Sequence, residues 1–160
     1  MSGLITIIKI RGSVGIKTPI KDTLLKLRLS ENNHCVVFKD SKVLQGMLFK
    51  VKDYITYGII DKETLKTLIT KRGRLIGNKR VTEEFLKEKN ITIDKLVDLF
   101  IEDPKKVYSL GIKNVFRLSP PSKGFERKGI KTPFTLGGAL GDRKDKINDL
   151  LKKMMWWLWL

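Results

Sequence analysis

The sequence has little of the chemistry that most enzymes and metal sites need. It holds one Cys and one His in 160 residues, so no intrachain disulfide can form and a zinc site of several Cys and His ligands is not expected. Cys35 and His34 are neighbours on an expected strand, where successive side chains point to opposite faces, which excludes a dyad between them. Cys35 is therefore interpreted as a core residue. The acids Asp98, Glu102 and Asp103 are interpreted as a solvated face. We expect no enzyme, no cofactor and no metal.

Long apolar runs are also missing. No stretch reaches the roughly 18 apolar residues that a transmembrane helix needs, and residues 1–10 lack the basic flank of a signal peptide. A single Cys suits a reducing compartment. We expect a soluble, cytoplasmic protein without a membrane partner.

Acidic residues are scarce relative to basic ones. The chain has 33 Lys and Arg against 17 Asp and Glu, a formal net charge of +16. Such a surface suits nucleic acid or an anionic membrane, and nucleic acid is favoured. A hydrophobic fraction of 41% is enough for a core, and the length suits one domain, or one domain with an appendage.

Hydrophobic spacing predicts three segments. Residues 1–60 are expected to fold as β-α-β-α-β, with Thr18 as an N-cap before Pro19. Residues 61–110 are expected to be a helical extension, close to neutral in charge. Residues 111–160 are expected to form a strand over 112–118, a basic loop over 119–141 and a final helix packed on the core.

Side chains at the expected helix ends support this division. Asp61, Thr82 and Thr92 have the residue types of N-caps, and Gly73 is typical of a helix end. Asp142 and Asp145 resemble a capping box for the final helix. In that helix, apolar residues repeat at helical spacing at Ile147, Leu150, Met154 and Leu158.

Residues 71–80 are the strongest local signal for binding. They hold five cations, two glycines and no acid. Because the cations repel one another unless an anion lies between them, we expect this loop to be mobile alone and ordered on RNA. The alternative is a solvated loop whose charges serve solubility.

A second basic stretch covers residues 113–134, with six cations and one acid. An extended loop of this kind can follow a groove of folded RNA, with Phe125 or Phe134 against a base or ribose. The alternative is a basic linker whose Phe side chains pack in the core. A third stretch, 9–18, ends a strand and opens a helix that would attract phosphate. Ile16 separates Gly15 from Lys17, so it is no nucleotide-binding P-loop.

Together these stretches give a set of expected RNA contacts. The glycines permit close approach of the backbone, and the cations neutralise phosphate, so specificity is expected from RNA shape. The expected contacts are Arg11, Gly12, Lys17, Lys71, Arg72, Gly73, Arg74, Gly77, Lys79, Arg80, Arg117, Lys123, Gly124, Arg127, Lys128 and Lys131. Three Trp within residues 156–160 are too apolar to remain in water, and are expected to pack on this chain or on a neighbouring component.

Several blocks of sequence resemble a known family in the same order along the chain. They are NHCVV at 33–37, GMLFKVKDYITYG at 46–58, KRGR and GNKR within 71–80, FRLSPP at 116–121, and the stretch from the glycine pair 137–138 to GDRKDKIN at 141–148. These blocks resemble the large-subunit ribosomal protein L-thirty family in its longer archaeal form, related to the eukaryotic protein called L-seven. The resemblance covers residues 3–155.

The resemblance implies an α+β fold, in which a β-α-β-α-β core forms a small antiparallel sheet related to ferredoxin-like folds. It also implies a structural protein of the large ribosomal subunit, which binds large-subunit ribosomal RNA beside neighbouring ribosomal proteins, with 5S RNA nearby and no small-molecule substrate. The alternatives are a free RNA-binding ribosome-assembly factor, or an RNA-modifying enzyme, for which the sequence offers no acid-base pair or cofactor pocket.

Overall fold

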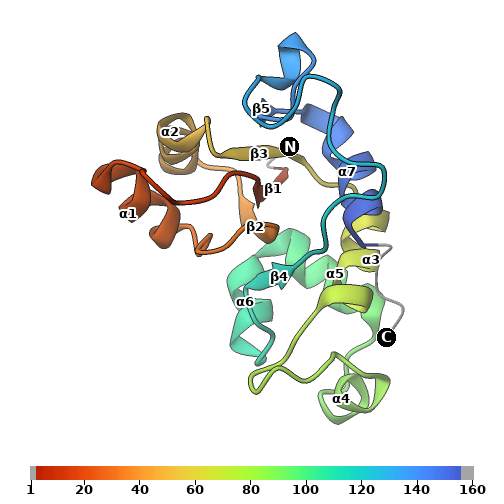
Figure 1. The fold of residues 1–160 in the computed structure, drawn as a ribbon. Helices are drawn as coiled ribbons and strands as arrows, with labels where there is room; N and C mark the ends of the chain where they lie inside the picture. The colour runs from red at the N-terminus through yellow and green to blue at the C-terminus, as the bar shows by residue number, and fades with distance from the viewer. Residues whose placement is uncertain (1–2, 156–160) are drawn as a thin grey trace.

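The computed structural model describes residues 3–155. Strands and helices alternate at first, several helices follow, and strands return near the end (Figure 1). The elements are β1 (Leu4–Lys9), α1 (Thr18–Lys26), β2 (His34–Lys39), α2 (Lys42–Val51), β3 (Ile55–Ile59), α3 (Lys62–Arg72), α4 (Glu83–Glu88), α5 (Ile93–Glu102), α6 (Pro104–Ser109), β4 (Val115–Arg117), the 3-10 helix η1 (Phe134–Leu136), β5 (Gly141–Asp142), the 3-10 helix η2 (Lys144–Lys146) and α7 (Ile147–Met155).

The five strands form one sheet in the order β4-β2-β1-β3-β5. All neighbours are antiparallel except β3 and β5, which are parallel. The α+β class and the β-α-β-α-β order of residues 1–60 are therefore confirmed. Because of these directions, the last residues of β1 and β4 and the first residues of β2, β3 and β5 lie at the same end of the sheet.

Helices cover both faces of the sheet. Alternate strand residues such as Ile7 and Val36 pack with α1 and α2, whereas Ile8, Cys35 and Val37 pack with α3, α5, α6 and α7. Figure 1 shows α1 and α2 on one side of the sheet and α3 and α7 on the other. Burial on both faces explains why residues 4–10 are almost continuously apolar. Cys35 is fully buried, as predicted.

The helix starts agree only in part with the predicted caps. The hydroxyls of Thr82 and Thr92 accept hydrogen bonds from the backbone N–H groups of Phe85 and Lys95, as expected of N-caps. Asp61 occupies the N-cap of α3 without a side-chain cap. The prediction for Thr18 is wrong, because Lys17 holds the cap position and Thr18 already lies in the helix.

The predicted start of the final helix is also wrong. Asp142 lies in β5, and its carboxylate accepts the backbone N–H of Lys144 at 2.8 Å. The chain then makes the η2 turn, so α7 begins only at Ile147. The predicted strand 112–118 is shortened to β4, with Ile112 in an isolated bridge to Leu75. Ile147, Leu150 and Met154 are buried as predicted, whereas Leu158 and the Trp residues lie outside the described residues.

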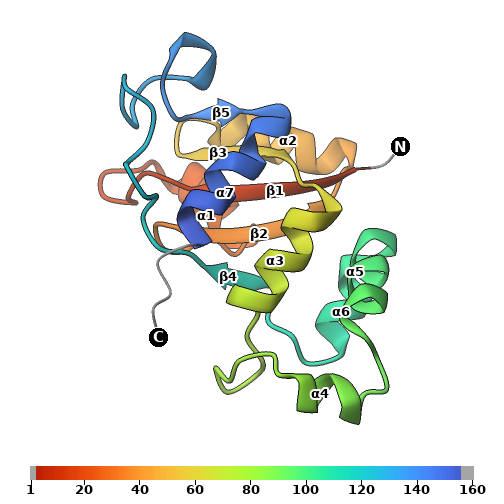
Figure 2. The ribbon, with the colours of Figure 1, turned by 90° about the vertical axis from the view of Figure 1, so that its right-hand side faces the viewer.

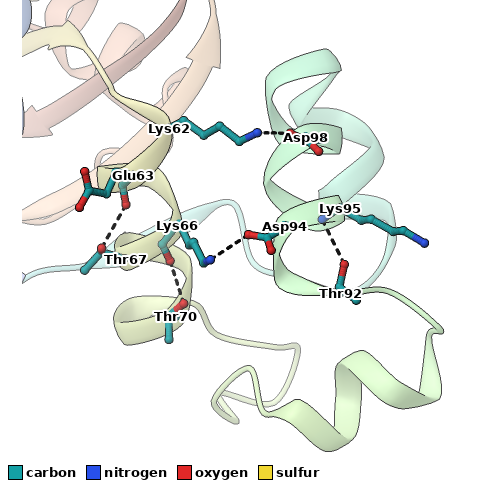
Figure 3. Close-up of polar contacts among 9 residues, drawn as sticks. All are labelled: Lys62, Glu63, Lys66, Thr67, Thr70, Thr92, Asp94, Lys95 and Asp98. Carbon is teal, nitrogen blue, oxygen red and sulfur yellow. Dashed lines mark hydrogen bonds and ion pairs between the residues drawn. The ribbon is translucent and has the colours of Figure 1, made fainter.

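The helical segment packs against the sheet mainly through apolar contacts. Phe100 and Tyr108 meet edge to face at 5.6 Å, and the Tyr108 hydroxyl donates to the Val37 carbonyl at 3.0 Å. Figure 3 shows two ion pairs between α3 and α5, Lys62 with Asp98 at 2.7 Å and Lys66 with Asp94 at 2.8 Å. Both pairs are exposed and contribute little stability. Among residues 3–155, no helix is long and apolar enough to cross a membrane.

Candidate RNA-binding surface

One end of the sheet gathers loops that are far apart in the sequence. The Asn33 N–H donates to the Lys9 carbonyl at 2.9 Å, and the Leu118 N–H donates to the Asn33 carbonyl at 3.0 Å. The Ile10 N–H donates to the Tyr54 carbonyl at 3.0 Å. These bonds bring loops 10–17 and 118–140 to one side of the molecule, which Figure 2 shows at the left. We call these two loops, with Arg117, the basic edge.

Loop 10–17 is fixed by two cations with different roles. Arg11 is half-buried, with its guanidinium 5.2 Å from the centre of the Tyr54 ring. Lys17 and Gly12 are exposed. Lys9 is only 1% exposed, and its ammonium donates to the Ser13 hydroxyl and to the Ser30 carbonyl. Burial lowers the pKa of Lys9. Sequence reasoning missed Lys9, although a lysine inside an apolar run was a usable signal.

Loop 118–140 is organised by a buried arginine that sequence reasoning also missed. Arg143 is 3% exposed. Its guanidinium donates to Thr56 Oγ1 at 2.8 Å, to the Ala139 carbonyl at 3.0 Å and to both carboxylate oxygens of Glu126. The signal was that Glu126 is the single acid in this basic loop. The exposed cations Lys123, Arg127, Lys128 and Lys131 are thereby held on a loop fixed to β3.

The Glu126 carboxyl responds to this pairing. Partial burial would raise its pKa, but hydrogen bonds from Arg143 and the charges of Arg143 and Lys153 bring the pKa below its usual value of 4.5. Glu126 is therefore ionised at neutral pH and neutralises Arg143, which leaves the exposed cations of the loop without this acid as a partner.

The two Phe side chains of this loop pack within the protein. Phe125 is half-buried against Ile10, Ala139 and Leu140. The Arg143 guanidinium lies over the Phe134 ring, with its carbon 4.8 Å from the ring centre. These contacts favour the alternative in which the aromatic rings anchor the loop instead of stacking on RNA bases.

Residues 74–80 form a hairpin. Arg74 and Arg80 are bridged, the Leu75 N–H donates to the Lys79 carbonyl at 2.7 Å, and Gly77 adopts φ +88° at the turn. The Lys113 N–H also donates to the Arg74 carbonyl at 2.7 Å. The shape of this loop is thus supported by hydrogen bonds within the chain. That the loop is mobile without RNA stays a prediction. Gly77 has open space beside it, as a close approach requires.

Arg72 is a correction to the predicted contact set. It is 7% exposed and its guanidinium donates to the Arg117 carbonyl at 3.1 Å, to Ser119 Oγ at 2.9 Å and to the Met154 carbonyl at 3.2 Å. Burial lowers the pKa of Arg72, as do the charges of Arg74 and Arg80. Its role is to join α3 and the hairpin to the basic edge.

Gly73 is buried beside Arg72, which argues against a close approach of RNA at this glycine. A Cβ at this position would lie 2.4 Å from the Ile69 carbonyl oxygen, so glycine is needed here for packing at the end of α3. Gly124 has open space beside it, like Gly77, whereas a Cβ at Gly12 would lie in ordinary contact with Asn32 Nδ2, at 3.8 Å.

The remaining predicted cations lie on two adjoining surfaces. At the hairpin, Arg74 is half-buried and Lys71, Lys79 and Arg80 are exposed. Arg117 is exposed at the basic edge. The hydrogen bond from Arg72 to the Arg117 carbonyl connects the hairpin to the basic edge. Within residues 3–155, no group of three or more His, Cys, Asp or Glu could hold a metal ion.

A family model and several curated proteins that this chain resembles all belong to one ribosomal protein family. The family model described as "Ribosomal protein L30p/L7e" matches residues 5–55. The chain is 53% identical over 150 residues to large ribosomal subunit protein uL30 of Methanococcus maripaludis (strain C5), covering 93% of this chain and 97% of that one. It is 45% identical over 149 residues to the protein of the same name from Nanoarchaeum equitans, with 92% and 96% covered. The corresponding protein of Methanopyrus kandleri is 41% identical over 148 residues, with 91% and 99% covered. The chain therefore belongs to the ribosomal protein L30p/L7e family.

Proposed function

We propose that this chain, a large-subunit ribosomal protein by its family, binds and stabilises folded ribosomal RNA through contacts of Lys and Arg with phosphate. The observation that carries the proposal is the convergence of separate basic segments. Residues 10–17 and 117–131 meet at one end of the sheet, and Arg72 fastens the hairpin beside them. Cations placed together on a preformed surface release counterions from RNA when they meet its phosphates.

The contacts that we propose are the predicted set without Arg72 and Gly73. They are Arg11, Gly12, Lys17, Lys71, Arg74, Gly77, Lys79, Arg80, Arg117, Lys123, Gly124, Arg127, Lys128 and Lys131. Phosphate contacts carry no base sequence, so specificity would come from the shape of the folded RNA. By this proposal the protein acts on the ribosome, beside neighbouring ribosomal proteins and with 5S RNA nearby, and no catalytic step is assigned to it.

The experiment compares two variants that lose the same charge. In the first, Arg117, Lys123, Arg127 and Lys128 at the basic edge become Gln. In the matched control, the exposed Lys87, Lys89, Lys95 and Lys105 of the helical segment become Gln. Binding to purified large-subunit RNA and to 5S RNA is measured with each. We expect the first variant to lose about tenfold or more in affinity and the control to lose much less. Equal losses would refute a localised surface.

Sedimentation separates the ribosomal role from that of an assembly factor. We expect the wild-type protein to remain with mature large subunits washed at moderate salt. A protein found on precursor particles and missing from washed subunits would instead be the free assembly factor.

A further inference from the structure

A hollow of about 500 Å³ lies beside strand β4, at the margin of the sheet. Its lining includes Arg28, Ser30, His34, Lys113 and Arg117. His34 is opposite Arg117 in the pairing of β2 with β4, and Arg28 follows helix α1. We call this hollow the Arg28 site. Of these five residues, only Arg117 belongs to the contacts proposed above.

The charges in the Arg28 site are strongly unbalanced. Its lining has three permanent cations and one His, and no acid. The acid nearest to His34 is Glu31, 3.6 Å from Nε2, with a side chain that is 79% exposed. Burial lowers the pKa of His34, and the charges of Arg117 and Lys9 lower it further against the opposing charge of Glu31. An anion in the hollow would relieve the repulsion among these cations.

His34 also has an unused polar atom. The side chain is only 13% exposed, and its Nδ1 is buried and makes no hydrogen bond with any described residue. Buried polar atoms in folded proteins are nearly always hydrogen-bonded, so an unpaired one calls for an explanation. An anion in the hollow would favour the imidazolium form, in which Nδ1 takes a proton from solvent and becomes a donor.

Arg28 occupies a backbone position that suits glycine. It has φ +65°, its N–H donates to the Leu25 carbonyl at 3.0 Å, and the Leu29 N–H donates to the Leu24 carbonyl at 2.9 Å. This pattern closes many helices, usually with glycine in the left-handed position. An arginine there is strained. The helix end therefore places a permanent positive charge in the lining of the hollow in spite of this strain.

We propose that the Arg28 site binds a phosphodiester group of ribosomal RNA, with Arg28, Lys113 and Arg117 around the phosphate and His34 as a pH-sensitive partner. This site rests on the proposed function and extends the RNA surface from the basic edge onto the α1 side of β4. Since the bound phosphate favours the imidazolium form, binding takes up a proton at His34. Affinity at the site therefore rises as the pH falls from neutral toward 6.

The test uses the fact that His34 is the single histidine of the sequence, so its imidazole NMR signal needs no assignment. The pKa of His34 is measured in the full-length protein with chloride, with inorganic phosphate and with a uridine trinucleotide, all at equal ionic strength. We expect both phosphate compounds to raise the pKa above its value in chloride. No rise with either compound overturns the site, and a rise with inorganic phosphate alone reduces it to a free-anion site and overturns the RNA assignment.

Arg28→Gly is the decisive variant because it removes the charge and relieves the strain together. We expect a melting temperature at or above that of the wild type, loss of most of the pKa rise, and a several-fold weaker affinity for large-subunit RNA. Lys87→Gln, on helix α4, should keep the full pKa rise. A full rise in Arg28→Gly would refute the site.

The outcome also separates this site from the proposed function. If the basic-edge variant loses RNA affinity while Arg28→Gly does not, the function stands and the Arg28 site fails. If the wild-type protein shows no salt-sensitive binding to the RNA, the proposed function fails whatever the NMR result.

Discussion

At the scale of single residues, the basic side chains of this protein fall into two groups. Lys9, Arg72 and Arg143 are almost fully buried and donate to oxygens of distant segments. Of these three, only Arg72 was among the predicted contacts, and the predicted cations other than Arg72 lie at the surface or partly at it. A buried cation with several acceptors is costly to replace, because its removal leaves those acceptors unpaired. The buried group therefore holds the loops that carry the exposed group.

Arg72 provides the first prediction. Arg72→Met keeps the length of the side chain but leaves the Arg117 carbonyl, Ser119 Oγ and the Met154 carbonyl without their donor. We expect the free energy of unfolding in urea to fall by about 2–4 kcal/mol. Lys87→Met on the surface of α4 is the control and should change it by less than about 0.5 kcal/mol. If Arg72→Met left the free energy of unfolding unchanged, the hydrogen bonds of the Arg72 guanidinium would not contribute to stability.

The pairing of Glu126 with Arg143 predicts a dependence on pH. The pKa of Glu126 is lower in the folded protein than its usual 4.5. Its stabilising contribution is therefore complete above about pH 4.5 and is lost as the pH falls through the folded-state pKa. We expect the difference in melting temperature between wild type and Glu126→Gln to shrink from about pH 6 to about pH 3. The control is Glu88→Gln on helix α4, and a constant difference for Glu126→Gln would contradict the pairing.

At the scale of elements, the hairpin and loop 118–140 present the cations. The hairpin is bonded to residues 111–113, and the loop is fixed by Arg143 and by the packing of Phe125. These contacts all lie within the protein. Exposed cations of the hairpin and of loop 118–140 can therefore be replaced without removing the contacts that hold the two elements. The two elements can therefore be tested separately for binding and for stability.

The hairpin predicts a loss of binding without a loss of stability. In the double variant Arg74→Gln and Lys79→Gln, large-subunit RNA affinity should fall by several-fold. The melting temperature should not fall, because the charge of Arg74 repels the buried Arg72. Binding by filter retention and melting by circular dichroism are the measurements. A lower melting temperature with unchanged binding would make the hairpin a structural element only.

Gly138 tests the support of loop 118–140. A Cβ at Gly138 would lie 1.9 Å from the Thr132 carbonyl oxygen, so Gly138→Ala must displace the backbone. We expect faster tryptic cleavage after Arg127, Lys128 and Lys131. Gly46→Ala is the matched control, since Gly46 lies in α2 with nothing within 4 Å. It should stabilise the protein by about 0.5–1 kcal/mol and leave the cleavage pattern unchanged. Equal cleavage rates in Gly138→Ala and Gly46→Ala would show that the packing of Gly138 does not hold loop 118–140 in place.

At the scale of the whole molecule, the three predicted segments are closely interleaved. Strands β4 and β5 from residues 111–160 flank the strands of residues 1–60, and one apolar cluster includes side chains from all three segments. The division into 1–60, 61–110 and 111–160 stays a proposal. The interleaving places the cations of the first and last segments on the same end of the sheet.

This arrangement predicts the salt dependence of binding. If roughly eight phosphates are neutralised, the logarithm of affinity for large-subunit RNA should fall with the logarithm of salt concentration at a slope of about −6 to −7. The hairpin double variant should reduce the magnitude of that slope by about 2. A slope close to zero for the wild type would contradict phosphate neutralisation as the source of affinity.

The order of the first five elements, the α+β class and the positions of the basic stretches could all be predicted from the sequence. Apolar spacing is a local property, and the caps Thr82 and Thr92 act on backbone only three residues away. The start of α7 could not be predicted in this way. Asp142 resembles a cap locally, but its pairing in β5 with Tyr57 of β3 uses it differently.

The sequence by itself determined the net charge, the local elements and the segments in which cations are dense, because these follow from residue types and near neighbours. Only the tertiary structure decided which cations remain available. Arg72 and Arg143 look locally like their neighbours, yet they find acceptors up to 82 and 87 residues away. A guanidinium turns inward where the fold brings carbonyls and carboxylates together around it, and no local pattern contains that information.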